Sequence, residues 1–211
     1  MPADHRVTVL VAKDNCHFFK LALCDTEEMF YRDVIDHIFR PTPEQASRRI
    51  YCRLPLLPEF LADMDLPHDL TGVESGFKLA NCGVWMSSSG NITPLHFDLC
   101  HGFLVQVTGE KQWSYFEPDD FRSLYPASSV DPNPLSSKVQ LDRWLAGDEE
   151  ERRKHPRVAE ATRYETAVTG GDLIYTPPFW WHCVTTVTPS ISVLLPFDMS
   201  PSEPIHSCAQ L

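Results

Sequence analysis

Two histidines and an aspartate occur in a pattern suited to binding one metal ion. His96 and Asp98 lie two residues apart in GNITPLHFDLCHG, and His182 follows 86 residues after His96, in GGDLIYTPPFWWHCV. On a β-strand, residues i and i+2 point to the same face, so an imidazole and a carboxylate can converge there. Two imidazoles and one carboxylate leave open positions on an octahedral ion, as in non-haem Fe(II) oxygenases. Taken alone, an HxD pair is weak evidence, because buried histidines more often pack in the core than bind metal.

Short β-rich segments must position these residues. Runs rich in Val, Ile, Thr, Tyr, Phe and Trp recur through the second half, separated by Gly, Pro, Asn and Asp. They are GVWMSS, FLVQVT, QWSYFE, RYETAV, DLIYTP, HCVTTV and SISVLLPF. This pattern predicts many short antiparallel strands in a sandwich or barrel, and so a mainly β fold.

The N-terminal part has a different pattern. Residues 7–12 predict a strand, and apolar residues at helical spacing predict an amphipathic helix over 27–39 with Thr26 as its N-cap. A further short helix is expected within 54–67. We therefore divide the chain into an N-terminal extension, 1–50, and a β domain, 51–211.

One interruption of the β pattern covers residues 127–160. It begins with Ser, Pro and Asn and ends in the charged run GDEEERRKHPR. Mixed-sign runs usually face water, so we interpret the segment as a solvated insertion with a helical piece. Long insertions between barrel strands also serve as substrate lids, and this second role is kept as an alternative.

Glycines and histidines repeat a common order in the two halves of the β domain. Gly90 precedes His96 by six residues, and Gly171 leads through a proline to His182. The two halves resemble the two cupin motifs, in which strand, turn and histidine follow in a fixed register. Phe179 stands where the second motif usually has glycine.

Two longer runs carry a narrower resemblance. TPLHFDLCHGFLVQVTGEKQWSYFEPDDFRSLYP and YETAVTGGDLIYTPPFWWHCV look like the JmjC-type 2-oxoglutarate oxygenases, and the match covers roughly residues 48–197. Within that family the chain is most similar to HxD-type hydroxylases, including the asparaginyl hydroxylase that modifies hypoxia-inducible factor. The resemblance implies a double-stranded β-helix, the jelly-roll or cupin fold, with short N-terminal helices.

The resemblance also assigns roles to single residues. The iron ligands are expected to be His96, Asp98 and His182. Lys111, thirteen residues after Asp98, matches the lysine that pairs with the distal carboxylate of 2-oxoglutarate. Such a dicarboxylate needs a buried cation at its far end. Thr93 and Tyr51 match a hydroxyl and a tyrosine that share this carboxylate; in isolation, Lys111 reads as a turn residue and Tyr51 as a core aromatic.

One position departs from the family pattern. Related hydroxylases often carry asparagine four residues after the aspartate, where this chain has Gly102. His101 precedes it, but a regular strand would point His101 to the face opposite His96. Cys100 and Cys183 lie beside ligands in sequence and are expected to point away from the metal as structural thiols.

The resemblance implies an Fe(II)- and 2-oxoglutarate-dependent dioxygenase that uses dioxygen to hydroxylate a C–H bond and releases succinate and CO2. A protein or peptide side chain is the preferred substrate. The same chemistry on a small molecule, a metabolite or natural product, is one alternative. A metal-binding cupin module without turnover is another, supported by Gly102.

Composition narrows the classes of partner and location. The chain has 18 Lys and Arg against 29 Asp and Glu, a net charge of -11, which argues against nucleic-acid binding. Seven cysteines without a CxxC pair indicate reduced thiols in an intracellular protein. The apolar run VTVLVA is broken by Lys13 and Asp14, so no signal peptide or membrane span is expected. A cytoplasmic or nuclear location follows, and the oligomeric state stays open.

Overall fold

Strands make up most of the regular structure. The computed structural model describes residues 3–18, 23–57, 60 and 81–210. Its strands are β1 Arg6–Ala12, β2 Cys24–Phe30, β3 Tyr51–Pro55, β4 Gly83–Ser87, β5 Ile92–His96, β6 His101–Thr108, β7 Lys111–Phe116, β8 Tyr164–Val168, β9 Leu173–Thr176, β10 Trp181–Thr186 and β11 Ser190–Phe197. Its α-helices are α1 Tyr31–Phe39, α2 Pro43–Ala46, α5 Leu141–Leu145 and α6 Glu149–Lys154. Single 3₁₀ turns span Pro118–Arg122, Pro156–Glu160 and Ser207–Gln210.

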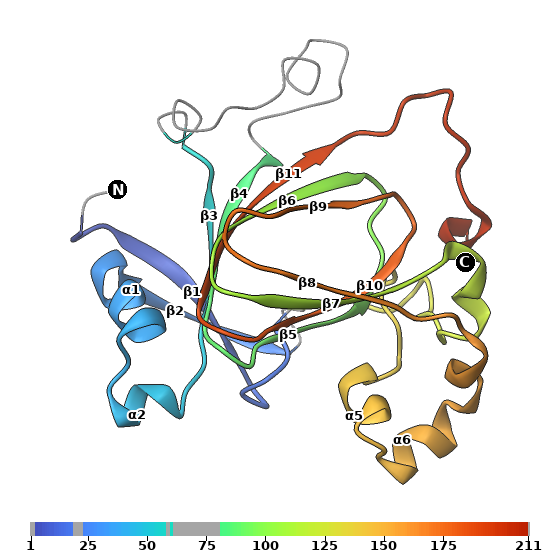
Figure 1. The fold of residues 1–211 in the computed structure, drawn as a ribbon, viewed down its shortest axis with the longest axis horizontal. Helices are drawn as coiled ribbons and strands as arrows, with labels where there is room; N and C mark the ends of the chain where they lie inside the picture. Colours follow the sequence, from blue (N-terminus) through green and yellow to red (C-terminus); the bar gives the residue numbers. More distant parts are fainter. Residues whose placement is uncertain (1–2, 19–22, 58–59, 61–80, 211) are drawn as a thin grey trace.

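The strands form two antiparallel sheets that face each other across a barrel (Figure 1). The larger sheet has the order β2-β1-β3-β4-β11-β6-β9, and the smaller has the order β5-β10-β7-β8. Partners such as β11 and β4, or β10 and β5, come from distant parts of the chain. This is the double-stranded β-helix, so the predicted fold class is confirmed, and every strand predicted from the sequence is present.

The helix expected over 27–39 is wrong at its start. Residues 27–30 belong to β2, which pairs with β1 in a register that sets Val9 opposite Glu27, and α1 begins at Tyr31. The acidic run after Thr26 resembles the first turn of a helix, but backbone hydrogen bonds to β1 hold it extended. The helix expected within 54–67 falls largely outside the described residues.

The edge of β5 that does not pair with β10 is covered by two segments from elsewhere in the chain. The amide of Ile92 donates to the carbonyl of Cys16 at 2.8 Å, and the amide of Phe97 donates to the carbonyl of Leu135 at 3.0 Å. The loop before β2 therefore covers one end of this edge strand, and the 127–160 insertion covers the other end.

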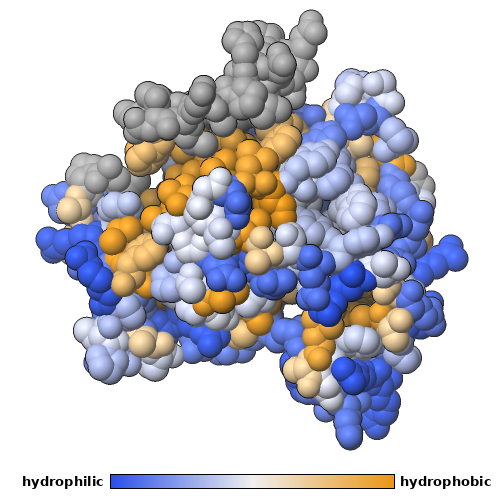
Figure 2. Space-filling view, viewed as in Figure 1, coloured by the Kyte–Doolittle hydropathy of each residue, from blue (hydrophilic) through white to orange (hydrophobic). Residues whose placement is uncertain are grey.

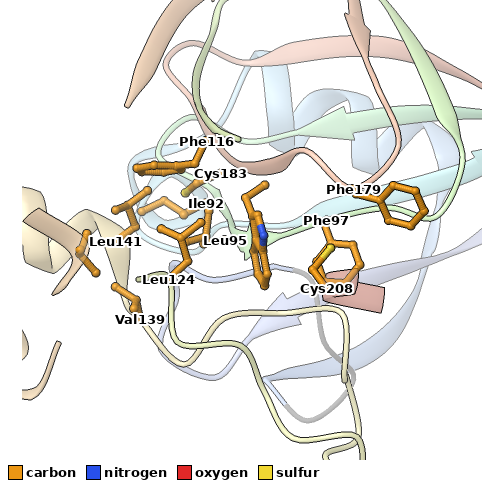
Figure 3. Packing of buried hydrophobic residues seen from close by; sticks show 12 residues of the cluster. Ile92, Leu95, Phe97, Phe116, Leu124, Val139, Leu141, Phe179, Cys183 and Cys208 are labelled. Atoms are coloured by element: carbon orange, nitrogen blue, oxygen red, sulfur yellow. The ribbon is translucent and has the colours of Figure 1, made fainter. Parts of the chain in front are cut away.

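The insertion packs on the outer face of the smaller sheet (Figure 3). Apolar side chains from both sides share one buried cluster, whose members include Val139, Leu141 and Val158 of the insertion with Leu95, Phe97 and Trp181 of the sheet segments. The ring centroids of Phe97 and Trp181 lie 4.7 Å apart in an edge-to-face arrangement. The insertion therefore completes a second layer of core on this face of the sheet.

The charged run of the insertion faces water, as predicted, except at one residue. Figure 2 shows mostly hydrophilic surface over α6. Glu151 is buried, where its carboxylate accepts from the amide of Gln140 at 2.8 Å and pairs with His155 at 2.9 Å. Among the described residues no helix is long and apolar enough to cross a membrane.

Candidate metal centre

The structure brings His96, Asp98 and His182 together inside the barrel. His96 ends β5, and His182 is its direct Cα partner on the neighbouring β10. Their ring centroids are 4.1 Å apart, and Nε2 of His182 lies 3.8 Å from Oδ2 of Asp98. One nitrogen or oxygen from each residue lies within 4.8 Å of the others. The three groups can therefore face a single ion.

Strand alternation explains why these side chains share a face. Phe97, between the two members of the HxD pair, points into the outer core, and Trp181 and Cys183, on either side of His182, do the same. Both histidines are only 4% exposed, whereas the side chain of Asp98 is 44% exposed. The centre is thus reached from the Asp98 side.

Backbone carbonyls fix the orientation of both imidazoles. Nδ1 of His96 donates to the carbonyl of Pro94 at 2.8 Å, and Nδ1 of His182 donates to the carbonyl of Trp180 at 3.0 Å. Because a carbonyl only accepts, each Nδ1 carries a proton, which leaves Nε2 as the nitrogen that can bind a metal. Burial, and next the proximity of His182, hold the pKa of His96 well below its usual value, so this ring is neutral. Neutral, oriented imidazoles are the form that binds metals.

A cavity of about 210 Å³ extends from the three residues into the barrel. All six residues singled out in the sequence line it, namely Tyr51, Thr93, His96, Asp98, Lys111 and His182. None of its described lining residues comes from the 127–160 insertion. The alternative in which the insertion acts as a lid over the site is therefore wrong for the described residues, since the insertion packs on the opposite face of the smaller sheet.

Lys111 lies at the other end of this cavity. It faces Thr186 on β10, four residues beyond His182, so roughly 13 Å of strand separates the two positions. Lys111 is 2% exposed, and no carboxylate of the described residues forms a salt bridge with it. Burial, with a smaller contribution from the charge of Arg53, lowers the pKa of Lys111 to about 7. A buried amine of this kind is suited to pairing with an anion that enters the cavity.

A β-bulge places Thr93 beside the same cavity. His96 faces His182 and Thr93 faces Val184, so three steps along β5 match two steps along β10. On a regular strand, the three-residue spacing would turn Thr93 away from the face of His96. The bulge restores Thr93 to the cavity side, where the alignment to the family had placed it.

Tyr51 and Arg53 project into the cavity from β3 of the larger sheet. Tyr51 is 2% exposed, and burial raises its pKa to about 12. The guanidinium of Arg53 lies 4.7 Å from the centre of the Trp85 ring and 5.4 Å from that of Tyr51. Arg53 was not predicted from the sequence. Its two-residue spacing from Tyr51 would have placed both side chains on one face, but only if residues 51–55 had been predicted to form a strand.

Aromatic side chains from β7 form a wall beside His182 and were also missed. The rings of Trp113 and Tyr115 are 5.7 Å and 5.9 Å from the imidazole of His182. The hydroxyl of Tyr115 and that of Thr176 are hydrogen-bonded at 2.7 Å. The sequence does contain a pattern that indicates this wall: in the strand KQWSYF, alternation puts Lys111, Trp113 and Tyr115 on one face.

The residues after Asp98 divide between the two faces. Gly102 lines the cavity, and a side chain there would meet only ordinary contacts at 3.9 Å from Leu194 and Thr176. His101 faces outward, as expected, and bonds the Tyr175 hydroxyl at 2.7 Å. Cys100 also lines the cavity, so its expected outward position is wrong, because it lies an even number of residues after both Asp98 and His96 and alternation places all three on one face.

Fold and site together define a cupin with a two-histidine, one-carboxylate centre. The cupin-like domain model matches residues 4–203, and the chain belongs to this family. Its relatives include the Jumonji C domain-containing protein 5 of Drosophila melanogaster, 29% identical over 77% of this chain and 40% of the relative. The lysine-specific demethylase JMJ30 of Arabidopsis thaliana is 35% identical over 56% of this chain and 26% of its own length. The tRNA wybutosine-synthesizing protein 5 of Mus musculus is 32% identical over 56% of this chain and 34% of its own length.

These relatives place the chain among proteins with JmjC domains, which typically use Fe(II) and 2-oxoglutarate as oxygenases. The chain spans 40% or less of the length of each relative named above. The narrower resemblance to the asparaginyl hydroxylase of hypoxia-inducible factor stays a prediction.

Proposed function

We propose that this protein is an Fe(II)- and 2-oxoglutarate-dependent dioxygenase that hydroxylates a C–H bond of a protein or peptide side chain. The observation that carries the proposal is the pairing, in one cavity, of a possible metal triad with a buried amine that no carboxylate of the described residues neutralises. A metal site alone needs no such amine. A co-substrate that binds metal at one end and carries a carboxylate at the other requires both.

The residues present fit this pair of ligands. His96, His182 and Asp98 offer the two-nitrogen, one-oxygen donor set of the facial triad. The ammonium of Lys111 would pair with the distal carboxylate of 2-oxoglutarate, and the hydroxyls of Thr93 and Tyr51 would donate hydrogen bonds to it. Iron(II), when bound, supplies the coupled oxidation of 2-oxoglutarate and substrate by dioxygen, which yields succinate, CO2 and a hydroxylated product.

Aromatic side chains beside His182 would exclude water from the metal-binding end of the cavity. The Trp113 and Tyr115 rings cover His182, and the Tyr115–Thr176 hydrogen bond joins the two sheets at that level. An apolar wall at this position keeps water away from the face of His182. Binding of the dicarboxylate would also restore the charge of Lys111, since the pKa of an amine rises beside an anion.

The exposure of Asp98 supports a large substrate over a small one. Its side chain is 44% exposed, and the described lining of the cavity includes no part of the insertion. A peptide segment could therefore reach the metal from the Asp98 side. The small-molecule alternative would need a roof over this side.

Succinate formation tests the proposal directly. Purified protein supplied with Fe(II), 2-oxoglutarate and dioxygen should form succinate slowly even without substrate. The variant Lys111→Met should lose this turnover, whereas Lys154→Met, which changes a lysine 57% exposed on α6, should keep it. Absence of succinate from the wild-type protein, with metal bound, would instead favour a metal-binding cupin module without turnover.

The substrate class is tested separately. Cell extract treated with the wild-type protein should show peptides that gain one oxygen only when 2-oxoglutarate is present. The Lys111→Met variant is the control for background oxidation. Oxygen gain confined to small molecules would refute the peptide substrate while leaving the oxygenase chemistry intact.

A further inference from the structure

A second group of metal-ligating side chains lies on the opposite face of the smaller sheet. Cys16 and His17 come from the loop before β2, and Asp142 lies in α5 of the insertion. One ligand atom from each lies within 4.8 Å of the other two. The group uses none of the residues assigned to the proposed oxygenase centre, so it stands or falls independently of that function.

The spacing of these atoms is close to that of a tetrahedral site. Nε2 of His17 lies 3.1 Å from Oδ1 of Asp142. From ordinary zinc bond lengths, a nitrogen and an oxygen on one tetrahedral ion are about 3.3 Å apart, and a thiolate lies about 3.6 Å from either. Closing the cluster around an ion therefore needs the Cys16 thiol to move by about 1.2 Å at most, and the Asp142 carboxylate to turn so that its oxygen and Nε2 of His17 face the ion and not each other. The chain offers these shifts because Cys16 is only half buried.

Asp14 holds His17 in the orientation that a ligand requires. One oxygen of Asp14 pairs with Nδ1 of His17 at 2.6 Å, and the other accepts from the amides of Cys16 and His17 at 3.0 and 2.9 Å. A carboxylate on Nδ1 directs Nε2 toward the metal in many zinc sites and makes it more basic. His17 is 7% exposed, so its ring has little freedom to leave this position.

Charge and access also suit a dication. Asp14 and Asp142 both flank His17, so two carboxylates would offset the charge of a bound dication. A cavity of about 400 Å³ opens beside the cluster, lined in part by Asp14, His17 and Asp142. A fourth ligand, such as water, can enter from it.

We propose that Cys16, His17 and Asp142 bind a zinc-type divalent cation whose fourth position opens to this cavity. Without the cation, the protonated ring of His17 donates from Nδ1 to Asp14 and from Nε2 to Asp142, and the cation takes the place of the Nε2 proton and of the thiol proton. The bound ion joins the loop before β2 to the insertion, which are the two segments that cover the edge of β5. The thiolate and imidazole donors select zinc over magnesium or calcium.

Cobalt(II) distinguishes this site from the first one. A thiolate ligand gives bound cobalt a sulfur-to-metal charge-transfer band, and the donor set of His96, Asp98 and His182 contains no sulfur. Cobalt titration of the wild-type protein should produce this band. The band should persist in His96→Ala and disappear in Cys16→Ser. A wild-type protein that binds cobalt without the band, or a Cys16→Ser variant that keeps it, would overturn the proposal.

Two further variants control for misfolding and for cobalt binding by other thiols. Cys100→Ser alters the thiol that lines the first cavity and should keep the band. Asp142→Asn removes a ligand while retaining shape, and should lower zinc content in the His96→Ala background from one equivalent to none. Zinc should raise the thermal midpoint of His96→Ala but not that of the Asp142→Asn double variant, and equal shifts in both would contradict the assignment.

Discussion

Replacing Lys111 with methionine should stabilise the protein while removing its binding of 2-oxoglutarate. Burial lowers the pKa of Lys111 from 10.5 to about 7, a displacement that corresponds to about 5 kcal/mol against the charged amine. Methionine fills a similar volume without charge, and replacement of even paired buried charges by apolar side chains is often neutral or stabilising by about 1–4 kcal/mol. We expect a gain of about 2–4 kcal/mol at pH 6, or roughly 5–10 °C in the unfolding midpoint.

The size of this effect depends on pH in a defined way. A lysine whose pKa is lowered on folding destabilises the folded state fully below its folded pKa of about 7. The penalty shrinks as pH rises from 7 toward the unfolded value of about 10.4. The advantage of Lys111→Met in the free energy of unfolding should therefore fall by more than half between pH 6 and pH 9.

Urea unfolding of the metal-free proteins at both pH values measures this advantage, and calorimetric titration measures 2-oxoglutarate binding. Lys154→Met is the matched control, because its lysine is 57% exposed and should change the unfolding free energy by less than about 0.5 kcal/mol. The reasoning is refuted if Lys111→Met is less stable than wild type at pH 6, or if it binds 2-oxoglutarate normally.

Three other predictions follow from the same cavity and core. The charged fraction of Lys111 falls about tenfold between pH 6 and pH 8. The Kd of the metal-loaded protein for 2-oxoglutarate should therefore rise about tenfold over this range. Calorimetry that shows no rise would contradict this prediction. Gly102→Asn, which meets only contacts of 3.9 Å, should fold normally and lower that Kd; a higher Kd would argue against the family alignment there. Trp181→Ala should cost about 3–5 kcal/mol of unfolding free energy. Trp181→Phe should cost much less, because the buried indole nitrogen has no hydrogen-bond partner among the described residues.

The sequence predicted the β domain well because its strands have regular signals. Runs such as SISVLLPF are bounded by turn residues, whereas the partners of that strand, β4 and β6, lie far from it in sequence and were not predicted. The error at β2 has a physical cause, since an exposed edge strand with four outward polar residues carries no apolar alternation. Its conformation is set by pairing with β1, and a local sequence pattern does not indicate this pairing.

The candidate site was predictable where one strand supplied several residues. His96 and Asp98 are close in sequence, and Lys111 followed from the family pattern. Arg53 was not found, because its position depends on β3 of the opposite sheet reaching the same cavity. Thr93 was found only through resemblance, since its spacing from His96 contradicts regular alternation and needs the bulge on β5.

The two segments that cover the edge of β5 also affect how the protein avoids aggregation. An uncovered edge strand presents a row of unpaired amides and carbonyls that can recruit another chain. Here the exchange of hydrogen bonds with residues 16–18 and 135–137 closes that row at both ends. Shortening the insertion would reopen it beside His96, so a trimmed protein should self-associate through the strand that carries the HxD pair, and lose soluble material before it loses its core.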